Sequence, residues 1–133
     1  MVIPDNIKQL YPYQGRYIDA QGGRQHYLDE GEATKGVILA VHGNPTWSFY
    51  WRKLIEAFGS DYRVVIPDHI GCGLSDKPQD WPYRLQGHID NLCALVEHLD
   101  LRDITLVVHD WGGAIGMGMA SRMVDRVSRL VVT

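Results

Sequence analysis

Asp110 lies between a predicted strand and a predicted helix, a position at which a side chain can take part in a reaction. The apolar run before it, residues 104–108, is rich in β-branched residues, and a helical pattern begins near Gly112. Only a sharp turn separates the two. This arrangement resembles a nucleophile elbow, in which a small residue two places on lets the helix pass close beneath the reactive side chain. The spacing therefore predicts Asp110 as a nucleophile.

An aspartate at this position determines which reaction is feasible. A carboxylate is ionised at neutral pH and needs no base to attack, so it suits displacement at a saturated carbon that carries a leaving group. The product is an alkyl ester on Asp110, which water must then cleave. Backbone N–H groups such as those of Trp111 and Asn44 would hold the developing oxyanion. The Trp111 indole and the Asn44 amide are further donors, suited to the leaving group.

The elements that would position Asp110 follow from hydrophobic patterning. Two short segments, residues 16–20 and 24–29, flank a Gln-Gly-Gly turn and predict a hairpin. Compact apolar runs predict buried parallel strands; they cover residues 36–41, 62–66, 104–108 and 127–132. Helical patterns lie between the strands, over residues 51–58, 85–99 and 112–123. The last pattern is rich in glycine, which indicates close packing against the sheet.

This alternation of strand and helix after an opening hairpin predicts an α/β fold with a mostly parallel sheet. In such sheets ligands bind beyond the C-terminal ends of the strands. Polar turn-forming clusters follow three of the strands, at residues 42–47, 67–73 and 109–113. These clusters should share one edge of the sheet, which is the expected place for a site.

The sequences of these clusters resemble a known family. Residues 42–46 read His-Gly-Asn-Pro-Thr, residues 71–78 read Gly-Cys-Gly-Leu-Ser-Asp-Lys-Pro, and residues 107–113 read Val-Val-His-Asp-Trp-Gly-Gly. Together they look like the haloalkane dehalogenase branch of the α/β-hydrolase superfamily. Residues 44–51 and 67–78 are similar, more closely, to the dehalogenase-like β-lactone decarboxylases of bacterial olefin biosynthesis.

The resemblance implies a set of roles. Asp110 would be the nucleophile, and Asn44 and Trp111 would bind the leaving group of the substrate. The implied activity is carbon–halide hydrolysis or conversion of a β-lactone to an alkene and carbon dioxide. Epoxide hydrolases resemble the chain too and are an alternative, although they usually carry an aromatic residue in place of Asn44 and a glycine in place of Val108.

The resemblance covers nearly the whole chain but only part of the family's fold, which continues with further strands and a helical cap. We interpret residues 1–133 as the N-terminal portion of one α/β-hydrolase domain. None of the six histidines falls at the position of the family's histidine base, so we expect no turnover from this chain alone. The strand at residues 127–132 would have an unpaired apolar edge, and we expect the chain to need its C-terminal part or to self-associate.

Composition favours a small apolar substrate. Of the 133 residues, 45% are hydrophobic and 22% charged, and a net charge of −3 offers no basic excess for nucleic acid or anionic lipid. The N-terminus lacks the features of a signal peptide, and no apolar run approaches the ~18 residues of a transmembrane segment. The two cysteines are too few and too far apart for a disulfide framework. We expect a cytoplasmic protein without a cofactor.

Other interpretations of the same motifs have less support. His42, His69 and His109 share the sheet edge, but their spacing matches no zinc signature, so no metal site is expected. Cys72 has no matched base, which indicates an inert thiol. No serine has the glycine frame of an elbow.

The Gly-x-Gly at residues 71–73 lacks the third glycine of a dinucleotide fingerprint, because position 76 is Asp76. Asp68 and Asp76 are interpreted as turn and capping groups. A non-catalytic α/β module that binds a small apolar ligand or a partner chain remains as the alternative to an enzyme.

Overall fold

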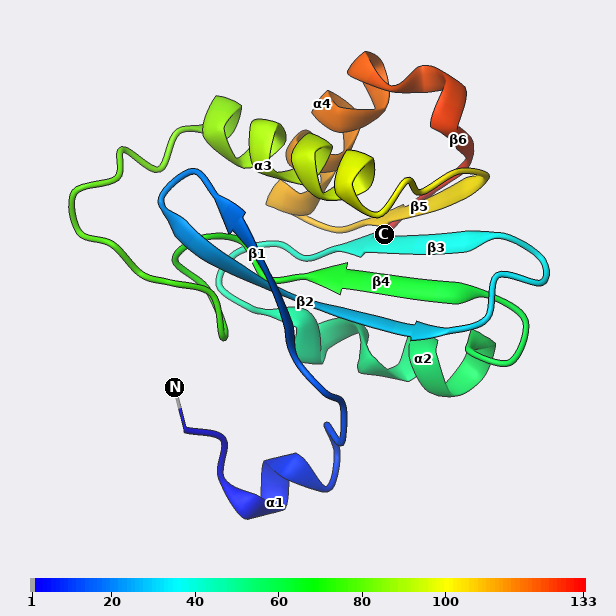
Figure 1. The fold of residues 1–133 in the computed structure, drawn as a ribbon, viewed down its shortest axis with the longest axis horizontal. Helices are drawn as coiled ribbons and strands as arrows, with labels where there is room; N and C mark the ends of the chain where they lie inside the picture. The colour runs from blue at the N-terminus through cyan, green and yellow to red at the C-terminus, as the bar shows by residue number, and fades with distance from the viewer. Residues whose placement is uncertain (1) are drawn as a thin grey trace.

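The computed structural model describes residues 2–133, which form a six-stranded mixed sheet with helices on both faces (Figure 1). The two N-terminal strands are antiparallel to their neighbours, and the remaining pairs are parallel. Across the sheet the strands run in the order β1 (Arg16–Ala20), β2 (Gly23–Gly31), β4 (Arg63–Pro67), β3 (Val37–Val41), β5 (Ile104–Val108) and β6 (Val127–Val132). The predicted α/β class, hairpin and parallel strands are confirmed.

The helices cover the sheet unevenly. Side by side on one face lie α3 (Leu85–His98) and α4 (Trp111–Arg122), while α2 (Arg52–Phe58) lies on the other (Figure 1). Three shorter helices were not predicted, because one turn is too short to show a period; they are α1 (Asp5–Lys8), η1 (Ser48–Trp51) and η2 (Val124–Arg126). The predicted helices therefore form the two layers around the sheet.

Strand β3 runs through the centre of the core. All five of its residues are buried. Leu39 and Val41 belong to the hydrophobic cluster under α3 and α4, whereas Ile38 and Ala40 belong to the cluster on the opposite face. This alternation is the period of two expected for a strand between two helical layers, and it fixes the loop that follows β3 at the C-terminal edge.

The glycines of α4 allow the close packing that the sequence indicates. A Cβ atom added at Gly112 would lie 2.2 Å from the carbonyl oxygen of Val41, and one at Gly118 would lie 2.3 Å from Ile89 Cδ1. Gly113 is the exception, since nothing lies within 4 Å of its Cβ position. Close approach therefore holds α4 against β3 and α3.

Strand β6 is the last strand of the sheet and carries exposed apolar side chains. Leu130 and Val131 are each 43% exposed, and Val132 is 71% exposed. Self-association through this edge stays a prediction. No helix within residues 2–133 is both long enough and apolar enough to cross a bilayer.

Candidate active site

Asp110 occupies a sharp turn between β5 and α4. Its backbone has φ 55° and ψ −132°, a left-handed φ that few residues other than glycine adopt, although aspartate is among those that tolerate it. Non-glycine residues in such conformations cluster at functional sites. The turn leaves the Asp110 side chain exposed at the C-terminal edge of the sheet, as the elbow spacing predicts.

Two backbone N–H groups hold the Asp110 carboxylate. The Asn44 N–H donates to Oδ2 over 3.0 Å. The N–H of Trp111, and after it that of Asn44, lowers the pKa of Asp110 below its ordinary range, with a smaller contribution from the charge of His109. The carboxylate is therefore ionised at neutral pH, and the two N–H groups predicted for the oxyanion lie beside it.

Gly43 lets the loop after β3 reach the elbow. A Cβ atom at this position would lie 2.4 Å from the Cβ of Asp110, closer than any side chain could approach. With glycine there, the loop brings Asn44 against Asp110, although the two residues are 66 positions apart.

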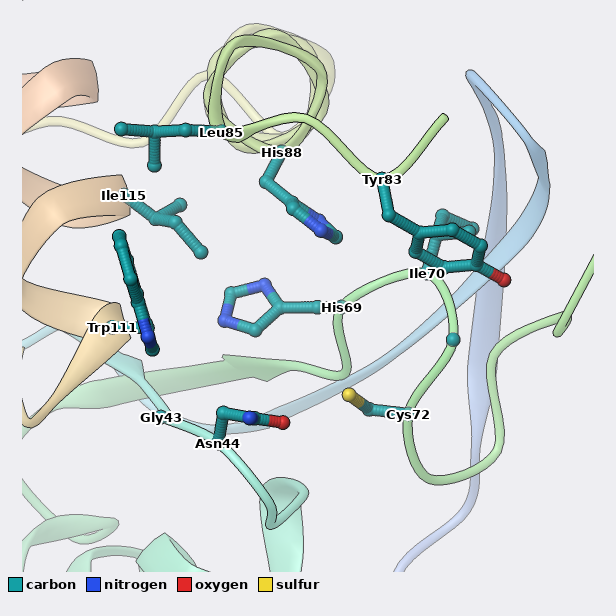
Figure 2. Close-up of a pocket in the computed structure, with 11 residues that line it drawn as sticks. Gly43, Asn44, His69, Ile70, Cys72, Tyr83, Leu85, His88, Trp111 and Ile115 are labelled. Carbon is teal, nitrogen blue, oxygen red and sulfur yellow. The ribbon is translucent and has the colours of Figure 1, made fainter. Parts of the chain in front are cut away.

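A cavity of about 400 Å³ opens beside the elbow. Figure 2 shows the side chains that surround it. They come from four segments: Gly43 and Asn44 after β3, the stretch His69–Cys72 after β4, Tyr83, Leu85 and His88 at the start of α3, and Trp111 and Ile115 of α4. The structure thus places the predicted Asn44 and Trp111 in the wall of one pocket next to Asp110.

Histidines join two of these loops beneath the pocket. His42 Nδ1 donates to the Gly43 carbonyl over 2.7 Å, and its Nε2 accepts the backbone N–H of His69 over 3.1 Å. His69 Nε2 donates in turn to the His42 carbonyl over 2.9 Å. Burial lowers the pKa of both rings, which keeps them neutral and fixes the two loops to each other.

No group of three or more metal-binding side chains occurs within residues 2–133. Cys72 lines the pocket, and burial raises the pKa of its thiol. A thiol with a raised pKa forms little thiolate at neutral pH and is a poor nucleophile. At neutral pH Asp110 is therefore ionised, whereas the Cys72 thiol is largely protonated.

The two aspartates interpreted as turn groups bind backbone away from the pocket wall. Asp68 is fully buried and accepts the N–H groups of Ser48 over 2.6 Å and Leu74 over 3.0 Å, together with His26 Nδ1 over 2.9 Å. Asp76 accepts the N–H of Arg24 over 2.8 Å. Their hydrogen bonds tie the long connection between β4 and α3 to the hairpin and to η1.

Sequence reasoning missed the α3 wall of the pocket. The helical period of residues 85–99 groups Leu85 with the apolar, core-facing positions and leaves His88 outside them. In the structure, however, Leu85 is 41% exposed and both residues line the cavity. Tyr83, just before α3, has φ 51° and also lines the cavity. No local pattern marks these residues as part of a pocket, because the cavity forms where four segments distant in the sequence come together.

Comparison with known proteins identifies the family. A model of the alpha/beta hydrolase fold matches residues 36–133. The chain belongs to the α/β-hydrolase family. This α/β-hydrolase is 48% identical over 129 residues to a cis-3-alkyl-4-alkyloxetan-2-one decarboxylase of Shewanella oneidensis, covering 95% of this chain and 40% of that protein. It is 43% identical over 124 residues to haloalkane dehalogenase 2 of Mycobacterium tuberculosis, covering 93% of this chain and 43% of that protein.

Solved structures agree with this placement. A tetrameric haloalkane dehalogenase of Paraglaciecola agarilytica superposes with a TM-score of 0.83 at 41% identity, covering 92% of this chain and 46% of that one. An epoxide hydrolase of Vigna radiata has a TM-score of 0.82 at 28% identity, covering 92% of this α/β-hydrolase and 40% of that chain. An oxetan-2-one is a β-lactone, so the predicted resemblance to both dehalogenases and β-lactone decarboxylases is confirmed. The chain spans less than half the length of these relatives.

Proposed function

We propose that this α/β-hydrolase uses Asp110 to attack a saturated carbon of a small apolar substrate, displacing a halide or opening a β-lactone. The position of Asp110 carries the proposal. Its ionised carboxylate lies at the tip of an elbow, 3.0 Å from the Asn44 N–H, and the neighbouring residues Asn44 and Trp111 line a cavity of about 400 Å³. That size suits a small organic ligand.

With a haloalkane, a carboxylate oxygen of Asp110 would form a new bond to carbon as the carbon–halogen bond breaks. The bonding electron pair leaves with the halide. Asn44 and Trp111 both face the cavity (Figure 2), and the amide and indole N–H groups of these residues are the donors available to receive the negative charge. The product is an alkyl ester on Asp110.

With a β-lactone, the same attack falls on the saturated ring carbon that is bonded to the ring oxygen. The ring carbon–oxygen bond breaks and leaves a carboxylate on the ester-bound chain. The bond between the chain and the carboxylate then breaks and releases carbon dioxide. Its electron pair forms the carbon–carbon double bond of the alkene. The bond between the chain and the Asp110 oxygen breaks at the same time, and its electron pair returns to Asp110. This sequence consumes no water, and the identity of 48% to a protein named as an oxetan-2-one decarboxylase supports it.

The experiment that tests the proposal is incubation of the protein with 1-bromobutane, followed by intact-mass measurement. Within residues 2–133 no histidine hydrogen-bonds to Asp110, and the His109 ring donates to the Thr133 carbonyl instead. Because these residues supply no base to activate water, we expect one butyl group per chain to accumulate. Sustained bromide release would contradict the stalled second step, and a chain that gains no mass would favour a non-catalytic binding module.

The rate of this alkylation should be almost independent of pH between about 5 and 8. The pKa of Asp110 lies below its ordinary value, so the carboxylate stays ionised throughout this range and loses its charge only in stronger acid. Alkylation of Cys72 would instead speed up with rising pH, because the pKa of that thiol is raised. Initial rates measured by mass spectrometry at several pH values separate the two.

Substituting Trp111→Phe should slow ester formation about ten- to a thousand-fold, as for loss of one preorganised donor. The change keeps one aromatic ring and removes the five-membered ring of the indole with its N–H. The Trp111 side chain is 58% exposed, so the fold should persist. The measurement is the adduct rate with 1-bromobutane, with the melting temperature as the check on folding. A folded variant that reacts at the wild-type rate would show that the indole N–H does not hold the leaving group.

A further inference from the structure

His69 presents a hydrogen-bond acceptor to the pocket. A neutral imidazole carries one N–H and one lone pair. The His69 Nε2 lies 2.9 Å from the carbonyl oxygen of His42, and a carbonyl oxygen can only accept, so the proton is on Nε2. The lone pair of the ring is therefore on Nδ1.

This Nδ1 has no hydrogen-bond partner within the described chain, although His69 is only 6% exposed and lines the cavity. In Figure 2 one ring nitrogen of His69 faces the side of Gly43, and the other faces the space toward His88 and Ile115. Burial, together with the neighbouring His42 and His88, lowers the pKa of the ring. The free nitrogen thus stays an acceptor and does not become a charged donor.

His88 supplies a second ring with unused hydrogen-bonding capacity. Its centroid is 5.4 Å from that of His69, with an interplanar angle of 63°. The Nδ1 of His88 is buried and has no partner. The Nδ1 of His69, which hydrogen-bonds to nothing in the described chain, lies beside the ring of His88 and faces the cavity. Because polar atoms of buried side chains are nearly always satisfied in proteins, this nitrogen indicates a polar group of the ligand next to it. A hydroxyl group fits this place, because it can donate its hydrogen to the lone pair on the Nδ1 of His69.

We propose that His69 is a specificity-determining residue whose Nδ1 accepts a hydrogen bond from a hydroxyl group of the substrate. The donors Asn44 and Trp111 lie on the other side of the His69 ring in Figure 2. The hydroxyl group is therefore placed away from the leaving group, along the carbon chain of the substrate. The site then favours electrophiles whose otherwise apolar carbon chain carries one hydroxyl group over those with a plain alkyl chain. The preference among electrophiles rests on the proposed function, whereas the binding of a hydroxyl group by His69 does not.

The binding test compares pentan-1-ol with its isomer butyl methyl ether, which has the same atoms but no donor. Titrations are followed by the ¹⁵N resonances of the His69 ring. We expect the alcohol to move the Nδ1 resonance and to bind about three- to tenfold more tightly than the ether, the range of one hydrogen bond. Equal binding, or a Nδ1 resonance that neither compound moves, would overturn the proposal.

Two variants separate ligand binding from the structural role of His69. In His69→Gln the amide reaches the position of Nε2 and can still donate to the His42 carbonyl, but the acceptor at Nδ1 is lost. In His69→Asn the amide lies near the position of Nδ1, so an acceptor stays while the bond to His42 is lost. The alcohol preference should disappear in the first variant and persist in the second. A preference that follows the bond to His42 instead would assign His69 a purely structural role.

Reaction rates distinguish failure of this proposal from failure of the proposed function. In the wild type, the rate of Asp110 adduct formation with 5-bromopentan-1-ol is divided by the rate with 1-bromopentane. This ratio should be about three- to tenfold larger than the same ratio in His69→Gln. Adducts that form with equal ratios in both proteins would contradict the role of His69 alone. Alcohol binding without any adduct would contradict the nucleophile alone.

Discussion

Substituting Asp110→Asn is expected to reduce ester formation with 1-bromobutane on the order of a thousand-fold or more, as for loss of a catalytic nucleophile. The amide is neutral and a far weaker nucleophile than the carboxylate. Asparagine also suits the backbone, because it tolerates the left-handed φ of 55° found here. The measurement is the rate of adduct formation by intact mass.

The matched control for this variant is its thermal unfolding. The Asp110 side chain is exposed and accepts hydrogen bonds from the backbone N–H groups of Asn44 and Trp111. The amide oxygen of asparagine can accept the same two hydrogen bonds. We therefore expect the melting temperature to stay close to that of the wild type. A folded Asp110→Asn protein that is alkylated at the wild-type rate would exclude Asp110 as the nucleophile.

Substituting Gly112→Ala should destabilise the fold by about 2–4 kcal/mol, as expected for overpacking against rigid backbone. The added Cβ would lie 2.2 Å from the Val41 carbonyl oxygen and 2.7 Å from that of His42. Neither atom can move without shifting β3 or the loop that carries Asn44. Urea unfolding measures the loss, and the same shift should slow adduct formation.

The adjacent glycine provides the control. Gly113 lies in the same helix with nothing within 4 Å of its Cβ position, so Gly113→Ala should be neutral or gain up to about 1 kcal/mol from helix propensity. If the two alanine variants unfold at the same urea concentration, the close approach of α4 to β3 does not stabilise the elbow.

The order of strands and helices could be predicted because each signal is local. The buried strands read as unbroken apolar runs, and β3, with five buried residues, is the clearest of them. The elbow could be placed for the same reason, since Asp110 lies between a strand pattern and a helix pattern only a few residues apart. Trp111 adjoins Asp110 in the sequence, and the rule that parallel strands end at one edge places the loop with Asn44 beside them. The family resemblance then implies their roles toward the leaving group.

The opposite wall of the pocket could not be predicted, because long-range packing decides it. The periodicity of α3 marks Leu85 as a core position, yet its side chain is 41% exposed and lines the cavity. From the sequence, His69 is a candidate only as a metal ligand together with His42 and His109, and no metal site is expected. Its bond to the His42 carbonyl, 27 residues away, is what turns the free ring nitrogen toward the pocket.

The most direct measurement of the central role of Asp110 is the location and chemical lability of the butyl group left by 1-bromobutane. Tandem mass spectrometry of the peptides should place the group on Asp110, and hydroxylamine should remove it, because the bond is an ester. A butyl group on Cys72 or Cys93 that resists hydroxylamine would be a thioether, and that result would contradict Asp110 as the nucleophile.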